Sequence, residues 1–268
     1  MKEVLIKIFT YDLLFRLKNY YNFLISIFYL GQKYHCPNCN TSFKKLLPCG
    51  LNQKVLNELE VIGSGLRDNC LCPRCNSIDR ERLIYLYLKY KTHIFSENIT
   101  MLHVSPRYSL KRIFKKHKNI NYIAGDKFEK GYNYTKDVIH IDLTSLNFDD
   151  EYFDVIICNH VLEHIPEDIK ALKEIYRVLK KDGFAILQVP LSLKLDKTLE
   201  GVANNEEERL KYYGQKDHYR IYAKDYFIKL ENCNFVVNAI NPNDAELNLD
   251  TQKYALNPKE DLIIVYKS

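Results

Sequence analysis

One stretch, Val138–Pro190, most constrains the fold of this 268-residue chain, because its hydrophobic period changes along its length. Val138–Ile141 and Phe153–Cys158 are short apolar runs rich in β-branched residues, as expected for strands buried on both faces of a sheet. Across Pro166–Lys181 the apolar residues recur at three- and four-residue steps, which predicts an amphipathic helix. Phe184–Val189 again has the pattern of a strand. Parallel strands joined through a helix form the core of an open α/β sheet.

The chain as a whole divides into three predicted segments. Residues 1–34 predict an amphipathic helical segment, and residues 35–92 a small zinc-ribbon-like module with a following helix. Residues 99–268 predict a Rossmann-like, doubly wound α/β domain, for which an apolar content of 46% supplies enough core. The net charge of +5 is modest and the lysines are scattered, so charge gives little support to a nucleic-acid partner.

Cysteines are concentrated in the second segment. Two C-x-x-C pairs are separated by 32 residues, Cys36 with Cys39 and Cys72 with Cys75. Two such pairs complete the tetrahedron that Zn²⁺ prefers, with no open position for catalysis, so we predict structural zinc. Cys70 could compete as a ligand, but the symmetric pairs are the simpler choice, and Cys49 and Cys70 are predicted to be small buried side chains. No signal-peptide cleavage site follows the first apolar run, so we expect a reducing, cytoplasmic setting.

The segment 1–34 leaves two alternatives open. Its longest run without a formal charge, Asn19–Gln32, has 14 residues, fewer than the roughly 20 needed to span a bilayer. The segment either packs on the domain behind it or lies at a membrane surface, with Lys7, Arg16 and Lys18 facing lipid head groups. The second alternative predicts peripheral membrane contact.

Residues at the ends of the predicted strands suggest a nucleoside ligand. Ser105, after the first strand, opens a turn without glycine, which argues against a pyrophosphate cradle and so against a dinucleotide. Asp126 ends the next strand and can accept both hydroxyls of a ribose. Asp142 can accept a hydrogen bond from an exocyclic amine such as that of adenine, and Leu143 supplies an apolar wall. The sequence therefore favours an adenosyl ligand.

These residues belong to a stretch that resembles a known family. FDVIICNHVLEHIPEDIKALKEIYRVLKKDGFAILQVP is similar to the class I, type 11, S-adenosylmethionine-dependent methyltransferases, and the resemblance covers roughly Ile99 to Lys267. CPxC and LCPRCxSxxRxR, combined with LHVSP and GQKDHYRIY, resemble a bacterial subgroup that carries a zinc-binding head. In that subgroup LHVSP stands where other methyltransferases carry their glycine motif.

The resemblance implies S-adenosyl-L-methionine as cofactor and assigns roles to individual residues. Asp126 would hold the ribose, and Asp142 with Leu143 the adenine. The remaining residues predicted to bind the cofactor are His103, Ser105 and Asn159. His160 would face both cofactor and substrate, and it is the first candidate for a catalytic base. In some related quinone O-methyltransferases a comparable pair of acids and a histidine binds a divalent cation. Here His160 replaces the first acid, so we favour local packing and hydrogen bonding for Glu163 and His164.

Two further groups are candidates for binding the methyl acceptor. The polar and aromatic run around Asp217, His218 and Arg220 predicts either a substrate-binding loop, with His218 a second base, or a rigid latch. Arg80 and Arg82 either form structural ion pairs or bind an anion in a cleft. We predict a methyltransferase that acts on a small-molecule or carbohydrate-like acceptor. The alternatives are an RNA methyltransferase that grips RNA with its zinc module, and a non-catalytic binding protein with the same fold.

Overall fold

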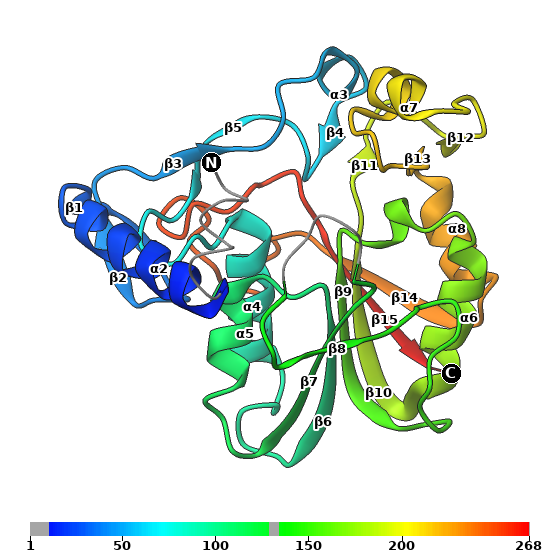
Figure 1. The fold of residues 1–268 in the computed structure, drawn as a ribbon, viewed down its shortest axis with the longest axis horizontal. Coiled ribbons are helices and arrows are strands. Elements are labelled where there is room, and N and C mark those ends of the chain that lie inside the picture. The colour runs from blue at the N-terminus through cyan, green and yellow to red at the C-terminus, as the bar shows by residue number, and fades with distance from the viewer. Residues whose placement is uncertain (1–10, 129–133, 268) are drawn as a thin grey trace.

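A seven-stranded mixed sheet forms the centre of the protein (Figure 1). The computed structural model describes residues 11–128 and 134–267. The strands lie in the order β14 (Phe235–Ile240), β15 (Leu262–Lys267), β10 (Leu179–Gln188), β9 (Phe153–Asn159), β6 (Ile99–Val104), β7 (Ile120–Asp126) and β8 (Val138–His140). The neighbours from β10 to β8 are parallel, whereas β15 runs antiparallel to both β10 and β14. This is the predicted Rossmann-like, doubly wound arrangement, and the order reverses at β6.

The predicted helix before β10 is shorter than its periodicity suggested. α6 spans Asp168–Val178, and β10 begins directly at Leu179. Leu179 pairs with Phe153 of β9, and a register shift follows before Phe184 pairs with Val155. The end of the predicted helix therefore belongs to the sheet, because pairing with β9 gives its backbone groups hydrogen bonds between strands.

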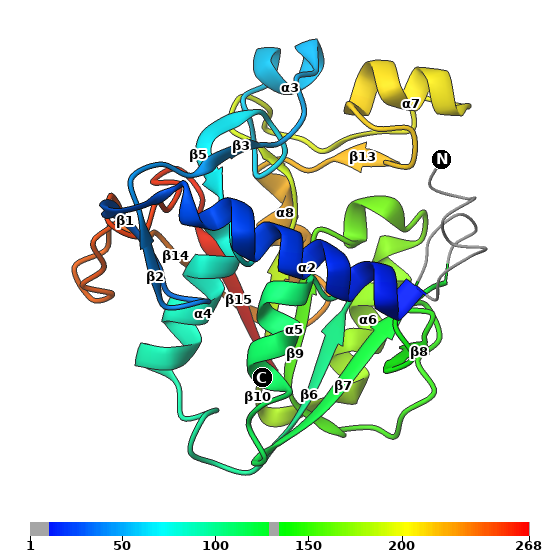
Figure 2. The same cartoon turned by 60° about the vertical axis from the view of Figure 1, so that its left-hand side comes forward.

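Helices cover both faces of the sheet. α4 (Asp79–Lys91) and α5 (Tyr108–Phe114) lie on one face, and α6 and α8 (Asp225–Glu231) on the other (Figures 1 and 2). Along β9 the buried side chains alternate, so that Ile156 packs in the α6 core and Ile157 in the α4 core. Because both faces of the strand are buried, its sequence is a continuous apolar run.

The N-terminal part of the chain packs against this domain. α2 (Tyr11–Ile27) leads into a hairpin of β1 (Leu30–Cys36) and β2 (Thr41–Phe43). β3 (Leu47–Cys49) then pairs with β5 (Arg67–Leu71), with α3 (Lys54–Glu58) and β4 (Val61–Ile62) between them. β4 pairs with β11 (Leu191–Ser192), and His35 N donates to Lys253 O. The segment 35–92, called the head below, is therefore joined to the domain by backbone hydrogen bonds.

The remaining elements gather near the ends of the central strands. A 3₁₀ turn, η1 (Leu162–His164), follows β9, and α7 (Glu206–Tyr213) lies between the paired strands β12 (Leu199–Glu200) and β13 (Arg220–Ile221). A small core of Leu56, Val61, Tyr213 and Ile221 packs α3 and β4 against α7 and β13. Head and domain thus enclose the edge where parallel-sheet proteins bind ligands.

Candidate active site

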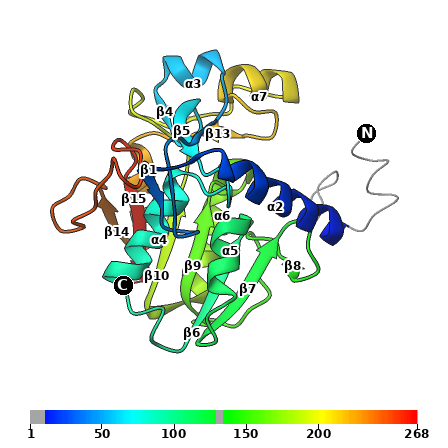
Figure 3. The same ribbon diagram turned by 90° about the vertical axis from the view of Figure 1, so that its left-hand side faces the viewer.

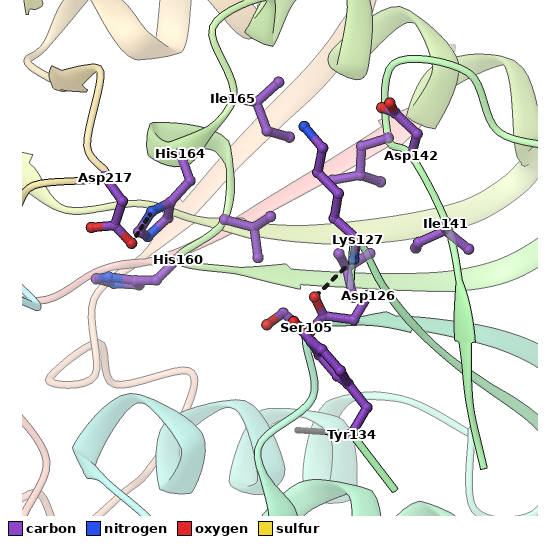
Figure 4. A pocket seen from close by; sticks show the side chains of 13 residues that line it. Ser105, Asp126, Lys127, Tyr134, Ile141, Asp142, His160, His164, Ile165 and Asp217 are labelled. Atoms are coloured by element: carbon purple, nitrogen blue, oxygen red, sulfur yellow. Dashed lines mark hydrogen bonds and ion pairs between the residues drawn. The ribbon is translucent and has the colours of Figure 1, made fainter. Parts of the chain in front are cut away.

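A cavity of about 240 Å³ opens at the carboxyl ends of β6, β7, β8 and β9 (Figure 4). Its walls come from the loops that follow these strands and from the loop before β13. The residues that line it are Val104, Ser105, Asp126, Lys127, Tyr134, Ile141, Asp142, Leu143, His160, Val161, His164, Ile165 and Asp217. Six of the residues predicted to bind cofactor or acceptor are therefore brought together: Ser105, Asp126, Asp142, Leu143, His160 and Asp217.

Two carboxylates are held in defined orientations on one side of the cavity. Asp126 Oδ1 accepts a hydrogen bond from Lys127 N at 2.8 Å. Asp142 Oδ1 accepts from both Thr144 N at 2.8 Å and Thr144 Oγ1 at 2.7 Å. These bonds lower the pKa of Asp142, because they stabilise its charged form. Strand geometry and local caps thus present two hydrogen-bond acceptors on neighbouring strand ends.

His103 is not available to a cofactor, which corrects its predicted role. The side chain is buried on the α5 face of the sheet, where Tyr122 Oη lies 3.0 Å from His103 Nδ1 and the Phe114 ring packs edge-on. Burial lowers the pKa of His103 to about 3, so the imidazole is neutral. Asn159 does not line the cavity either. Its Oδ1 is buried and has no hydrogen-bond partner among the described residues.

A cluster of acids and histidines, the acid–histidine cluster below, lies at the other side of the cavity. His164 Nδ1 is 3.1 Å from Asp217 Oδ2, and the His164 and His218 rings meet edge-on, 4.6 Å between centroids. Glu163 is buried, with His160 Nδ1 at 3.5 Å and His164 Nε2 at 4.0 Å from its Oε1. Ligand atoms of Glu163, His164 and His218 lie within 4.8 Å of one another, a separation that a cation could bridge.

Burial sets the protonation of this cluster. It raises the pKa of Glu163. Neither carboxyl oxygen of Glu163 has a hydrogen-bond partner in the described part of the chain, which corrects the predicted hydrogen bonding of this side chain. Burial also lowers the pKa of His160 well below its usual value, with the Arg80 charge adding to the effect, and lowers that of His218 to about 3. Both imidazoles are neutral near pH 7, so each has one acceptor nitrogen. In His218 this is Nε2, which lies 2.6 Å from the donor Nε2 of Gln215, whereas His160 Nε2 has no hydrogen-bond partner among the described residues.

Arg82 and Arg220 are structural, which corrects their predicted role in binding the acceptor. Arg82 is fully buried and donates to the carbonyl oxygens of four residues: Cys70, Ser77, Tyr254 and Ala255. Arg220 donates to the carbonyl oxygens of Leu162, Ile165 and Pro166 and to the carboxylate of Glu200. Both guanidinium groups bind backbone carbonyls: Arg82 joins the head to the connection between β14 and β15, and Arg220 binds the carbonyls around η1. Arg80 instead donates to Gly63 O at 2.6 Å, next to the acid–histidine cluster.

Glu260 is a residue of this region that sequence reasoning missed. It is 5% exposed, and neither carboxyl oxygen has a hydrogen-bond partner among the residues described. A Cβ atom placed on Gly63 would lie 3.2 Å from Glu260 Oε1 and 2.8 Å from His160 Nε2, so both side chains approach the same glycine. Glu260 lies in the long connection between β14 and β15, and nothing in its local sequence pattern marks it.

The four predicted metal-ligating cysteines converge in the head. Their sulfur atoms lie within 4.8 Å of one another, with Cys36 Sγ 3.6 Å from Cys75 Sγ and Cys39 Sγ 3.8 Å from Cys72 Sγ. A tetrahedral zinc with bonds of about 2.3 Å separates its sulfurs by about 3.8 Å, so the donor set fits Zn²⁺. Ser77 Oγ lies 3.1 Å from Cys36 Sγ and 3.3 Å from Cys75 Sγ. Cys49, half-buried, and Cys70, buried, lie outside this group.

A comparison with known proteins supports the fold seen in the structure. A family model described as "Methyltransferase domain" matches residues 96–187, which contain β6 to β10 and the cavity-lining loops between them. No curated protein matches the chain. The match and the strand order together show a methyltransferase domain fold.

Several solved structures are distantly similar. A SAM-dependent methyltransferase from Archaeoglobus fulgidus is 16% identical, with a TM-score of 0.45, over 70% of this chain and 94% of its own. The YcgJ protein from Bacillus subtilis is 16% identical, with a TM-score of 0.41, over 69% of this chain and 99% of its own. Haemonchus contortus phosphoethanolamine N-methyltransferase 2, in complex with S-adenosyl-L-methionine, is 15% identical, with a TM-score of 0.41, over 60% of this chain and 38% of its own. Similarity at this distance identifies no substrate for this chain.

Proposed function

We propose that the protein is an S-adenosyl-L-methionine-dependent methyltransferase. The observation that carries the proposal is the pair of oriented carboxylates, Asp126 and Asp142, on successive strand ends of a methyltransferase domain fold, both lining one cavity. Asp126 would accept the ribose hydroxyls, and Asp142 the adenine amine against the apolar wall of Leu143. When bound, the cofactor supplies an activated methyl group on a sulfonium.

The chain's own residues have a limited task in such a reaction. They must align the acceptor with the methyl group, exclude water and, where the acceptor carries a proton, remove it. His160 lies on the cavity wall, neutral and with Nε2 lacking a hydrogen-bond partner among the described residues, so it is the preferred proton acceptor. His218 is buried behind His164 and is the second candidate.

The acceptor would be a small polar molecule. Buried polar atoms without partners in the described structure cluster beside the cavity, on His160, Glu163 and Glu260. Such atoms carry an unfavourable desolvation energy until a ligand or water bonds them. A hydroxylated acceptor, such as a carbohydrate-like intermediate, could supply those bonds, and the cavity volume of about 240 Å³ favours a small ligand over RNA.

The head would hold one structural zinc ion through Cys36, Cys39, Cys72 and Cys75. Four thiolates close the coordination sphere, so the ion would stabilise the head and take no part in methyl transfer. Thiolate ligation favours a reducing compartment such as the cytoplasm.

Calorimetric titration of zinc-replete protein with S-adenosylmethionine and S-adenosylhomocysteine tests the proposal. We expect micromolar binding by the wild type, loss of binding in Asp126→Ala, and unchanged binding in Asp149→Ala, which removes an exposed carboxylate outside the cavity. If the folded wild type binds neither compound, the enzyme proposal fails, and a non-catalytic binding protein with this fold becomes the better description.

A further inference from the structure

Helix α2 carries large apolar side chains on the face that points away from the rest of the molecule. Leu13, Leu17, Tyr20, Leu24 and Ile27 recur at alternating four- and three-residue steps, so they form one stripe along the helix. Their exposed fractions lie between 41% and 63%. We call these five residues the outer stripe. Tyr21 and Phe28 flank it and are 62% and 75% exposed.

The opposite face of α2 is attached to the protein by polar contacts. Ser26 is fully buried, and its Oγ donates to Phe23 O at 2.7 Å and accepts from Arg74 Nε at 3.1 Å. The Arg74 guanidinium also lies 5.0 Å from the centroid of the Phe23 ring. A surface helix ordinarily buries its apolar face against the core. α2 has the reverse orientation, so packing against the described residues does not explain the outer stripe.

Charge around the outer stripe is mostly positive, with Asp12 at the start of α2 the one acidic residue of the helix. Between Leu13 and Asn57 the sequence contains no Asp or Glu but six Lys and Arg residues. Five of these are exposed and belong to none of the ion pairs found among the described residues: Arg16, Lys18, Lys33, Lys44 and Lys45. Lys44 N donates to Tyr29 O, which brings this end of the β1–β2 hairpin to the end of α2.

We propose that α2 and the β1–β2 hairpin bind to the surface of an anionic phospholipid bilayer. The outer stripe would enter the headgroup–acyl boundary, and the surrounding cations would pair with lipid phosphates. Tyrosine and phenylalanine are suited to that boundary. A second copy of the chain fits less well, because pairing through this face would bring together two surfaces on which cations outnumber acids. No helix in the described ranges is both long enough and apolar enough to cross a bilayer, so α2 would lie in its plane.

The position of α2 links this surface to the cavity. Figures 2 and 3 show α2 crossing obliquely above α5, near the level at which β6 and β7 end, the same edge that carries the cavity. A bilayer seated on α2 would therefore lie close to the cavity. The inference does not depend on the proposed methyl transfer.

Vesicle co-sedimentation of the full chain tests this inference. We expect binding to phosphatidylcholine vesicles that contain phosphatidylglycerol, weaker binding to phosphatidylcholine alone, and weakening by salt. Each cation near an anionic surface contributes about fivefold, so Lys44→Ala with Lys45→Ala should lower the partition coefficient by roughly 30-fold. Leu17→Glu with Leu24→Glu should abolish binding. Ile228→Glu, on the exposed face of α8, is the matched control and should bind as the wild type does.

The same variants separate a bilayer from a second copy. Light scattering should show one oligomeric state for the wild type and for the variant with Leu17→Glu and Leu24→Glu, and thermal unfolding should show that both are folded. A dimer that these substitutions dissociate would overturn the proposal in favour of self-association. Absence of vesicle binding by the wild type, or binding that the substitutions leave unchanged, would also overturn it.

Discussion

Gly63 lies directly against the imidazole of His160. A Cβ atom on Gly63 would stand 2.7 Å from His160 Cε1 and 2.8 Å from Nε2. Gly63 follows β4 in the head and has a φ of +84°, whereas His160 follows β9 of the domain. The head therefore supplies a wall of the acid–histidine cluster, at a point where only a residue without a side chain fits.

Gly63→Ala should consequently perturb His160 as well as the head. A positive φ costs an alanine about 1 kcal/mol, and the contact with His160 adds a steric term. Gly201→Ala is the matched control, because Gly201 has a φ of +74° and a Cβ atom there would meet no other atom within 4 Å. We expect urea unfolding to show a loss of about 1 kcal/mol for Gly201→Ala and at least twice that for Gly63→Ala. Equal losses would contradict the close approach.

Glu260 should make stability fall as pH rises. Burial, aided by the Asp79 charge, raises the pKa of Glu260 from 4.5 to about 7. Because the folded state binds this proton more tightly, the resulting stabilisation is complete below pH 4.5 and disappears as pH rises through 7. Glu260→Gln cannot ionise, so its stability relative to the wild type should increase between pH 5 and pH 8, by up to about 3 kcal/mol.

Urea unfolding of both proteins across that pH range measures the difference. Glu97→Gln, at an exposed glutamate, is the control and should run parallel to the wild type. A constant difference between Glu260→Gln and the wild type at all pH values would show that Glu260 is not a buried neutral acid.

Hydrophobic period predicted the sheet correctly because each strand's pattern is set by burial within the strand itself. The runs at Val138–Ile141 and Phe153–Cys158 became β8 and β9 nearly residue for residue. The boundary between α6 and β10 was wrong, since it is decided by pairing with β9, a contact that periodicity within one segment does not report.

The candidate site residues also differ in how far local sequence determines their position. Asp126 and Asp142 could be placed at one edge from the sequence because strand ends of a parallel sheet share an edge, and the structure has both at the cavity; their binding of a cofactor stays a prediction. Arg82, Arg220 and His103 were assigned wrongly, because the partner of a long or titratable side chain comes from distant segments. Arg82, for example, donates to Tyr254 O, 172 residues away in the chain. Glu260 was missed for the same reason.

The cysteine group in the head should retain one zinc ion per chain. Cys39→Ser removes one of four donors and should lower the zinc content and destabilise the head, since metal binding and folding are coupled there. Cys49→Ser is the matched control, because Cys49 lies in the head but outside the group. Elemental analysis of purified, dialysed protein measures the metal. Equal loss of zinc in both variants would show that the ligand set is wrong.

Arg220 should fix the turn that carries Glu163 and His164. Its exposed fraction is 5%, and it bonds the carbonyl oxygens of Leu162 and Ile165 on either side of that turn. Lysine keeps the charge but cannot reach several carbonyls with a planar fork, so Arg220→Lys should leave buried oxygens unpaired and cost about 2–4 kcal/mol. Arg209→Lys, at a partly exposed arginine that donates to Lys216 O, should cost less than about 1 kcal/mol.

Hydrogen exchange distinguishes a local effect of Arg220 from general destabilisation. The amide of His164 donates to Val161 O within the turn, so its protection should fall in Arg220→Lys more than that of the β9 amides does. If protection decreases equally in β9 and in the turn, Arg220 stabilises the whole domain and does not specifically order the acid–histidine cluster. If Arg220→Lys is as stable as the wild type and equally protected, both roles are contradicted.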